Sequence, residues 1–298
     1  MTVPSGLVVV DKPAGWTSHD VVARIRRLAG TRRVGHAGTL DPMATGVLVV
    51  GVGKATRLLG HLALTEKEYA ASIRLGAVTD TDDADGEVVA TAPAAGVPSG
   101  ALAAAIAALT GEIQQVPPGV SAIKVGGKRA YRLAREGTAP QLAARTVTVS
   151  DLTVGAVRPS GDYLDVDVTI TCSSGTYIRA IARDLGAALG VGGHLTALRR
   201  TRVGPYLIGG ARTLDQLAAG LQVIPLADAA AAAFPRRDLT ADEARLAAHG
   251  GRLPGTGPSQ AAVAETTDLV AAFGPDGTLI ALLADEQGRA RPIAVFVP

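Results

Sequence analysis

"RVGHAGTLDPMATGVLVVGVGK", residues 33–54, places one carboxylate, Asp41, between small residues and a strongly apolar run. The run of Val and Leu after Thr45 predicts a buried strand, because its apolar residues follow one another almost without interruption. Acidic residues on solvated surfaces usually have charged neighbours, and Asp41 has almost none. We therefore expect Asp41 in a buried or cleft-lining turn. On spacing alone, the favoured interpretation is an aspartate that caps the turn before Pro42.

The composition is that of a globular chain. Its 298 residues are 47% hydrophobic and 19% charged, which suffices for one large core and a small second domain. A single cysteine, Cys172, excludes an internal disulfide framework and a cysteine-based zinc site. The N-terminus has no basic-then-apolar signal pattern, and the apolar run 46–52 is too short to span a bilayer. We therefore expect a cytoplasmic protein without a membrane partner.

Strand and helix patterns are mixed along the chain without a regular βαβ alternation. This predicts an α+β fold, with a mixed or antiparallel central sheet flanked by helices. A helix over residues 19–29, capped by Thr17 or Ser18, and an amphipathic helix over 175–189 are the clearest helical segments. The pattern weakens near residues 224–239, and three strands follow it. We expect one domain over residues 1–235 and a small β-rich domain over 236–298.

Several familiar motifs fail on inspection. The segment GVGKAT, residues 51–56, lacks the glycine and hydroxyl residue of a phosphate-binding loop, because Leu48 and Ala55 stand there. The segment TDTDDADGE, residues 79–87, lacks the end ligands of a calcium loop, so we expect a solvated acidic turn with a tight reversal. The histidines have no metal-ligand spacing, and no nucleophile elbow is present. These absences disfavour a metal enzyme, a nucleotide hydrolase and a serine hydrolase.

Positive charge is concentrated in three segments, although the formal net charge is only +2. Such clustering predicts a polarised surface that binds a polyanion, because phosphate neutralisation releases counterions. For any one cluster, a solvated helix or strand face is the alternative. The clusters are Arg24, Arg26, Arg27, Arg32 and Arg33; Lys124, Lys128, Arg129, Arg132, Arg135 and Arg145; and Arg199, Arg200 and Arg202.

The segment GHAGTLDPMATGVL closely resembles the signature of the TruB family of tRNA pseudouridine synthases. The resemblance extends, in family order, over GLVVVDKPAGWTSHDVV, KEYAASIRLGAVTDTDDADGEVV, VPPGVSAIKVGGKRAYRLAREG, CSSGTYIRAIARDLG and GGHLTALRRTRVGPY. It implies the pseudouridine synthase fold with a PUA-like C-terminal domain. It also implies an enzyme that isomerises uridine 55 in the T-loop of tRNA. Such a reaction needs no metal, cofactor or obligatory protein partner, and the T-arm stem-loop is the implied RNA partner.

The resemblance assigns three catalytic residues. Asp41 matches the aspartate that begins cleavage of the glycosidic bond, and Arg179 matches the arginine paired with it. Tyr69 matches the aromatic residue that stacks on the flipped base and helps to remove the proton at C5. From the residues alone, a half-buried strand aromatic is the commoner role for Tyr69, and Arg179 can pair with Asp184 or reach solvent. Whether Asp41 attacks C1′, adds to C6 or removes a sugar proton stays open.

The resemblance also assigns three substrate-binding residues. Leu198 matches an apolar residue packed beside the target base, His36 a histidine that helps to displace the uridine, and Lys12 a strand end near the site. Taken singly, Leu198 is an ordinary core residue and His36 an ordinary turn residue. Base flipping costs a few kcal/mol, so an aromatic platform and an apolar wall suit the chemistry.

The basic segment 124–145 matches a thumb-like insertion that closes over the T-arm, with Gly126 and Gly127 as a hinge. We expect it to be mobile without RNA. The implied RNA-binding residues are Lys124, Lys128, Arg129, Arg132, Arg199, Arg200 and Arg202. The alternatives are a non-catalytic chaperone that refolds tRNA, and a synthase that acts on another RNA with guide and partner proteins. We expect a monomer, because one chain carries every required part.

Overall fold

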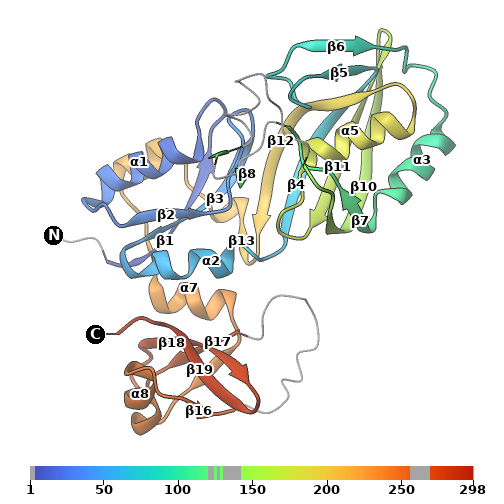
Figure 1. Ribbon diagram of the computed structural model, residues 1–298. Helices are drawn as coiled ribbons and strands as arrows, with labels where there is room; N and C mark the ends of the chain where they lie inside the picture. The colour runs from blue at the N-terminus through green and yellow to red at the C-terminus, as the bar shows by residue number, and fades with distance from the viewer. Residues whose placement is uncertain (1–3, 120–123, 126–127, 130–141, 256–268, 298) are drawn as a thin grey trace.

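The computed structural model describes residues 4–119, 124–125, 128–129, 142–255 and 269–297. It contains a ten-stranded mixed sheet flanked by helices, and a separate five-stranded sheet near the C-terminus (Figure 1). The predicted α+β class is therefore confirmed. No helix among these residues is long and apolar enough to cross a membrane.

The ten-stranded sheet has the order β14-β1-β3-β12-β4-β11-β10-β7, with β13 paired to β12 and β2 paired to β3. Its strands are β1 (Gly6–Lys12), β2 (Val34–Ala37), β3 (Thr45–Val52), β4 (Lys67–Leu75), β7 (Gly111–Gln115), β10 (Arg145–Ser160), β11 (Tyr163–Cys172), β12 (Gly193–Val203), β13 (Tyr206–Leu207) and β14 (Ile224–Pro225). Neighbouring strands are antiparallel except at the centre, where β3 and β12 run parallel. This parallel junction consists of two residue pairs, Arg199 with Thr45 and Arg200 with Gly46. The sheet therefore has two halves joined by a short seam.

The apolar run that opened the sequence analysis forms β3, and both of its faces are buried. Val47 and Val49 pack into one hydrophobic cluster, while Leu48 and Val50 pack into another on the opposite face. Strand β4 instead alternates between buried and more exposed positions, since one of its faces is open. The difference follows from the period of two in a strand, and it separates a central strand from a half-covered one.

Helices cover both halves of the large sheet (Figure 1). Helix α1 begins after Thr17, whose side chain forms a capping box with Asp20, and it ends at Gly30 in the left-handed region, as predicted. The helical segments of this part are α1 (Ser18–Ala29), η1 (Gly53–Arg57), α2 (Leu59–Leu62), α3 (Ser99–Ala108), α5 (Ile178–Ala188), η2 (Ile208–Gly210), α6 (Leu214–Ala219) and α7 (Leu226–Ala233). Two short hairpins complete it: β5 (Ala77–Thr79) with β6 (Val88–Thr91), and β8 (Lys124–Val125) with β9 (Lys128–Arg129).

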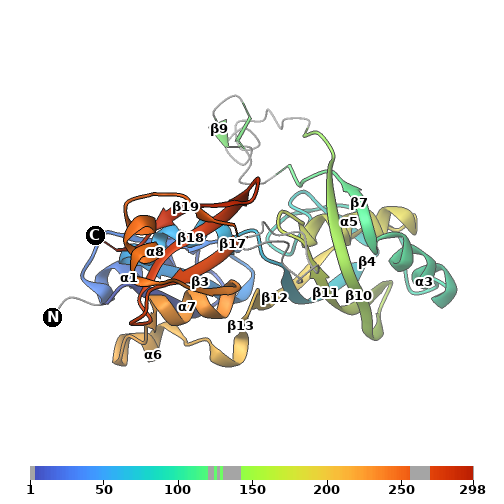
Figure 2. The same cartoon turned by 90° about the horizontal axis from the view of Figure 1, so that it is seen from below.

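The C-terminal strands form the five-stranded sheet, in the order β15-β17-β18-β19-β16, with one helix beside it. Its elements are β15 (Arg236–Asp238), α8 (Ala241–Ala248), β16 (Leu253–Pro254), β17 (Leu269–Phe273), β18 (Leu279–Glu286) and β19 (Arg289–Val295). The three strands expected from the sequence are confirmed. Figure 2 shows this sheet beside the half that carries α1 and β3, away from α3 and β7.

The C-terminal sheet shares a hydrophobic cluster with the first half of the large sheet. Phe273 and Leu282 belong to the same buried cluster as Leu7 of β1 and Ala229 of α7. The neighbouring residue Leu283 faces the other way, into a cluster formed with α8. The predicted boundary at residue 235 thus crosses a continuous core, and it stays a prediction.

This shared core predicts that the two parts unfold together. Leu282→Ala should lower the free energy of unfolding by roughly 2–5 kcal/mol, because it opens a cavity between the parts. Urea unfolding should be followed by the fluorescence of Trp16, the only tryptophan, which packs against the core of the first half. Leu283→Ala, in the cluster with α8, should lower the same midpoint, because one cooperative unit loses stability wherever the cavity lies. Leu246→Ala, at an exposed position of α8, is the control and should leave the midpoint almost unchanged. An unchanged Trp16 midpoint in Leu282→Ala would contradict a shared core.

Candidate functional site

Asp41 lies in the loop between β2 and β3, close to the seam where β3 meets β12. Its side chain is 34% exposed, and its Oδ2 lies 3.0 Å from Nε of Arg179. Arg179 comes from the first turn of α5, so the partner of this carboxylate is far away in sequence. The expected contact with Arg179 is confirmed, and the isolation of Asp41 in the sequence is explained by a distant cation rather than by a turn cap.

Arg179 also contacts the acidic turn. It is 4% exposed, and its Nη1 donates a hydrogen bond of 2.9 Å to the carbonyl of Thr81 and lies 3.4 Å from Oδ2 of Asp83. The alternative pairing with Asp184 is not formed, since that carboxylate pairs with Arg183. One buried guanidinium therefore joins the Asp41 loop, α5 and the turn of residues 79–87.

The expectation of a fully solvated acidic turn is wrong for Asp83, which is 4% exposed. Its carboxylate accepts hydrogen bonds from Thr81 Oγ1 at 2.6 Å and from the backbone N–H of Asp85 at 3.1 Å. Its charge is balanced by Arg179, which the local sequence does not reveal. Sequence reasoning missed this residue because a run of acidic turn residues looks the same whether one of them is buried or not.

Burial and its neighbours act on the pKa of Asp41 in opposite directions. Burial raises the pKa above the ordinary value for aspartate, Arg179 lowers it, and Asp83 raises it again. The net direction is upward. Without the arginine, the carboxylate would be easier to protonate, so Arg179 favours the ionised form of Asp41.

The loop that carries Asp41 is held from behind. Lys12 is fully buried, and its ammonium group donates hydrogen bonds to the carbonyls of Pro13, Trp16 and Pro42. Ser18 holds the other side, by accepting from the N–H of Leu40 at 2.9 Å. Burial lowers the pKa of Lys12 to about 8. The structure therefore places Lys12 behind the loop, with all three of its hydrogens used, rather than in the cleft as a substrate contact.

A cleft of about 290 Å³ opens beside Asp41. Tyr69 of β4, Leu198 of β12 and Ile178 of α5 line it together with Asp41 and Arg179. Tyr69 is 7% exposed, and burial raises the pKa of its phenol. The structure thus brings four of the predicted catalytic and substrate-binding residues into one cleft: a carboxylate, its arginine, an aromatic side chain and an aliphatic side chain.

His36 lies outside this group. It sits on β2, paired with Val50, and its ring meets that of His19 edge-on with centroids 5.8 Å apart. Its buried Nδ1 has no hydrogen-bond partner among the described residues, and burial lowers the pKa of the imidazole. The histidine is therefore neutral at physiological pH and borders α1 rather than the lining of the cleft.

The expectation of a surface position is wrong for Arg200, whereas the side chains of Arg199 and Arg202 are 41% and 24% exposed. Nη2 of Arg199 lies 2.8 Å from Oδ2 of Asp11, and Nη2 of Arg202 lies 3.2 Å from Oε2 of Glu66. Both charges therefore have carboxylate partners. Arg200 is 1% exposed, and it is one of the residues that line the cleft. The reason is that β12 is a central strand, whose side chains alternate between two partly covered faces.

The other predicted RNA-binding residues are only partly described. Lys124, Lys128 and Arg129 belong to the hairpin of β8 and β9, which is described by its backbone. Arg132, Gly126 and Gly127 lie outside the described residues, as does most of the predicted thumb.

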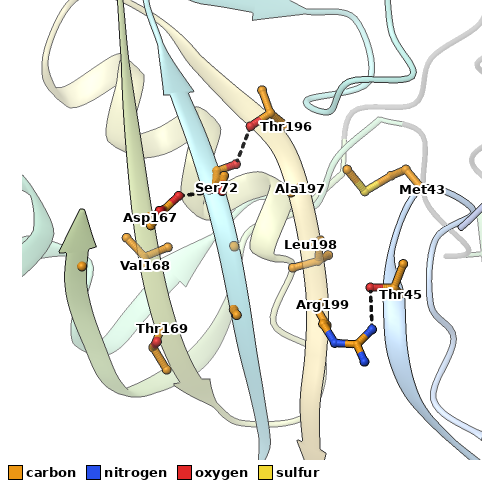
Figure 3. A pocket seen from close by; sticks show the side chains of 13 residues that line it. Met43, Thr45, Ser72, Asp167, Val168, Thr169, Thr196, Ala197, Leu198 and Arg199 are labelled. Atoms are coloured by element: carbon orange, nitrogen blue, oxygen red, sulfur yellow. Dashed lines mark hydrogen bonds between the residues drawn. The ribbon is translucent and has the colours of Figure 1, made fainter. Parts of the chain in front are cut away.

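A larger hollow of about 540 Å³ lies on the other face of the same strands (Figure 3). Leu198 borders both hollows. The charged groups of the larger one have partners: Asp167 accepts from Ser72 and Arg158, and Arg199 donates to Thr45 and Asp11. We therefore assign the chemistry to the smaller cleft, where a carboxylate faces open space. In the described part of the chain, no group of three His, Cys, Asp or Glu side chains could hold a metal ion.

Family models match most of the chain. Residues 26–178 match the model described as TruB family pseudouridylate synthase (N terminal domain). Residues 179–228 match a tRNA pseudouridylate synthase B C-terminal domain, and residues 234–297 match the model described as tRNA Pseudouridine synthase II, C terminal.

Similar proteins cover nearly the full length. A tRNA pseudouridine synthase B from Arthrobacter sp. is 62% identical over 99% of this chain and 97% of its own, and one from Thermobifida fusca is 62% identical over 98% of each. Among solved structures, a chain of a Cbf5-Nop10-Gar1 complex matches with a TM-score of 0.73 and 28% identity. The match covers 98% of this chain and 85% of that one. A structure of an H/ACA RNP bound to a substrate RNA containing 2′-deoxyuridine matches with a TM-score of 0.71 and 27% identity, over 98% of this chain and 85% of the other.

The geometry around Arg179 predicts how the pKa of Asp41 responds to substitution. Asp83→Asn removes a negative charge, so the pKa of Asp41 should fall, whereas Arg179→Gln removes the stabilising cation, so it should rise. In the unaltered chain it should exceed 3.8, the reference value. Carbon-13 NMR of the aspartate carboxyl groups measures the pKa of Asp41 in each variant. Asp184→Asn is the control and should leave that pKa unchanged. A fall in Arg179→Gln would refute the role of that cation.

Proposed function

Because the chain belongs to the TruB family and is a tRNA pseudouridine synthase, we propose that its target is uridine 55, in the T-loop of tRNA. The observation that carries the proposal is the Asp41–Arg179 ion pair, with 3.0 Å between Oδ2 and Nε, at the wall of a cleft that also holds Tyr69. An ionised carboxylate facing a space the size of a nucleoside is suited to attack or to take a proton.

The reaction begins at Asp41. The carboxylate starts cleavage of the bond between C1′ and N1, the detached uracil rotates, and a new bond forms between C1′ and C5. The proton at C5 is then lost to a base and N1 gains a proton, so the product has the same atoms and charge as uridine and no external reactant is needed. Attack on C1′, addition to C6 and removal of a sugar proton all need an ionised Asp41. Arg179 supports each route by keeping the carboxylate charged and oriented.

The target base must leave its stack before it can reach Asp41. Leu198 and Ile178 offer an apolar wall, and Tyr69 offers an aromatic face for stacking, which together offset the few kcal/mol of unstacking. Burial raises the pKa of the Tyr69 phenol, and the nearby charge of Arg200 lowers it. We assign to this hydroxyl a part in removing the proton at C5.

The remaining parts of the proposal concern the surroundings of the site. The domain of residues 1–235 carries the chemistry, and the PUA-like domain of 236–298 assists in binding the T-arm. The enzyme works in the cytoplasm as a monomer, without a cofactor or an obligatory protein partner. The presence of Asp41, Tyr69 and Arg179 in one chain supports this. His36 helps to displace the uridine, and Lys12 acts by holding the Asp41 loop.

A synthase that acts on another RNA with protein partners is the second candidate. The likeness to the Cbf5-Nop10-Gar1 complex, with a TM-score of 0.73, favours it. Identity of 62% to tRNA pseudouridine synthases B over almost the whole chain favours the tRNA substrate more strongly.

The test uses the purified chain and an unmodified T-arm stem-loop, followed by mapping of pseudouridine along the RNA. We expect product at position 55 alone and without added protein. Product at another position, or product that appears only when partner proteins are added, would overturn the proposed target.

Asp41→Asn should reduce the rate of pseudouridine formation by at least about 10³-fold, because every route needs the carboxylate. Its Kd for the stem-loop should change little. Asp184→Asn, on the same helix as Arg179, is the matched control and should retain the full rate. An unchanged yield of pseudouridine from Asp41→Asn would refute the proposed mechanism.

Tyr69→Phe keeps the stacking face and removes the hydroxyl. It should therefore lower the single-turnover rate by roughly 10²–10⁴-fold while leaving the Kd for the stem-loop almost unchanged. Tyr69→Ala should weaken binding as well, because the stacking surface is lost. If Tyr69→Phe loses binding rather than rate, the hydroxyl serves recognition and not proton removal.

A further inference from the structure

The cleft contains two buried cations that the proposed reaction does not use. Lys67 is 6% exposed and Arg200 is 1% exposed, and both line the cleft. They lie side by side against Gly38: a Cβ added to that glycine would be 3.7 Å from Cε of Lys67 and 3.7 Å from Nη1 of Arg200. This pair, Lys67 and Arg200, is called the cation pair below.

Neither member of the cation pair has a carboxylate partner in the described part of the chain. Arg200 donates to the backbone carbonyls of Val47, Thr39 and Gly38, at 2.7, 3.3 and 3.1 Å. The neighbouring arginine Arg199 is paired with an aspartate. Two adjacent buried positive charges without a counter-ion destabilise a fold, since burial of a charge is costly unless it is compensated.

Lys67 also has a hydrogen to spare. Its ammonium group donates to the carbonyls of Ala63 and Thr65, and within the described residues its third hydrogen has no acceptor. Lys12 is the contrast, because all three of its hydrogens are used. Burial and the charge of Arg200 lower the pKa of Lys67 to about 8, as expected for a cation that lacks an anion.

The cation pair is not among the main neighbours of the proposed catalytic carboxylate. The charges that shift the pKa of Asp41 come from Arg179, Asp83 and Lys12, whereas the largest charge acting on Lys67 is that of Arg200. Ser174, Gly175 and Thr176 also line the cleft, and a Cβ at Gly175 would meet nothing within 4 Å. Buried cations, hydroxyl groups and an open glycine are groups that bind phosphate.

We propose that Lys67 and Arg200 bind a backbone phosphate that flanks the target uridine, and so hold C1′ of that nucleotide against Asp41. The inference rests on the proposed function and extends it to the recognition of the RNA backbone. A phosphate supplies the full negative charge that the cation pair lacks, which a uracil oxygen does not. Phosphates flank every ribose, so one reaches the cleft whenever the base does.

The experiment is a double-mutant cycle that combines one change in the protein with one change in the RNA. The protein change is Lys67→Met, and the RNA change replaces each phosphate next to the target uridine, in turn, by a neutral methylphosphonate. The nucleotide on the 5′ side of each such linkage carries a 2′-deoxy sugar, in the phosphate control as well, so that the linkage is not cleaved. Kd is measured in the Asp41→Asn background, where the RNA is not converted.

At one of the two linkages, Lys67→Met alone and the methylphosphonate alone should each raise Kd about tenfold. The two changes combined should raise Kd no further than either one. Lys67→Met should also reduce the slope of log Kd against log salt concentration by roughly 0.7–1, the value of one phosphate contact. A merely structural lysine would leave that slope unchanged. Lys67→Gln serves as a second variant if the Met variant does not fold.

Lys54→Met is the matched control, since Lys54 lines a different hollow, beside Ser5 and Phe296. It should show no coupling to either linkage. If the increases in Kd from Lys67→Met and from the methylphosphonate multiply at both linkages, the phosphate assignment is overturned. It is also overturned if Lys67→Met leaves the slope of log Kd against log salt concentration unchanged. Absence of pseudouridine from the natural stem-loop with the unaltered chain would instead defeat the proposed function, so the two failures are distinguishable.

Discussion

The contact between β3 and β12 is the constraint on which the site depends. Gly46 has a φ of +101° there, and a Cβ on it would lie only 2.2 Å from the carbonyl oxygen of Arg200. Any side chain at this position would push the two strands apart. Because the two strands meet here over only two residue pairs, the two halves of the sheet would then separate. The Asp41 loop precedes β3 and Leu198 lies on β12, so this one close approach brings the opposite walls of the cleft together.

Buried charged side chains are accommodated in this structure in two different ways. Arg179 is surrounded by two carboxylates, Asp41 and Asp83, so its burial is compensated by the protein itself. Lys12 and Arg200 instead donate hydrogen bonds to backbone carbonyls of the loop that carries Asp41 or of its flanks, which leaves Arg200 without a counter-ion among the described residues. The same hydrogen bonds that satisfy these cations therefore also fix the loop. The carboxylate can be both ionised and partly open to the cleft because its surroundings are rigid.

Much of the fold could be predicted from the sequence, and the site only in part. The uninterrupted run of β3, the alternation of β4 and the cap of α1 at Thr17 are local signals, and all are confirmed. The partnership of Asp41 with Arg179 came from resemblance to a family, because no spacing rule joins residues so far apart. Asp83 was missed for the same reason.

The arginines of β12 show a different failure. A basic residue on a strand was interpreted as exposed, but Arg200 lies on the covered face of a central strand. Which face of a strand is covered depends on elements elsewhere in the chain, here the loop at Gly38 and Thr39. Charge clustering in a sequence reports composition, and it does not report on which side of a sheet the charges lie.

The hydrophobic cluster shared by the C-terminal sheet and β1 has an evolutionary consequence. A tail attached by a flexible linker can be exchanged between relatives by recombination, but this one presents Phe273 and Leu282 to Leu7 and Ala229. A transplanted tail would bring an apolar face shaped for a different host. Substitutions in the tail and in the first half are therefore expected to occur in compensating pairs, and the tail to be inherited together with the half on which it packs.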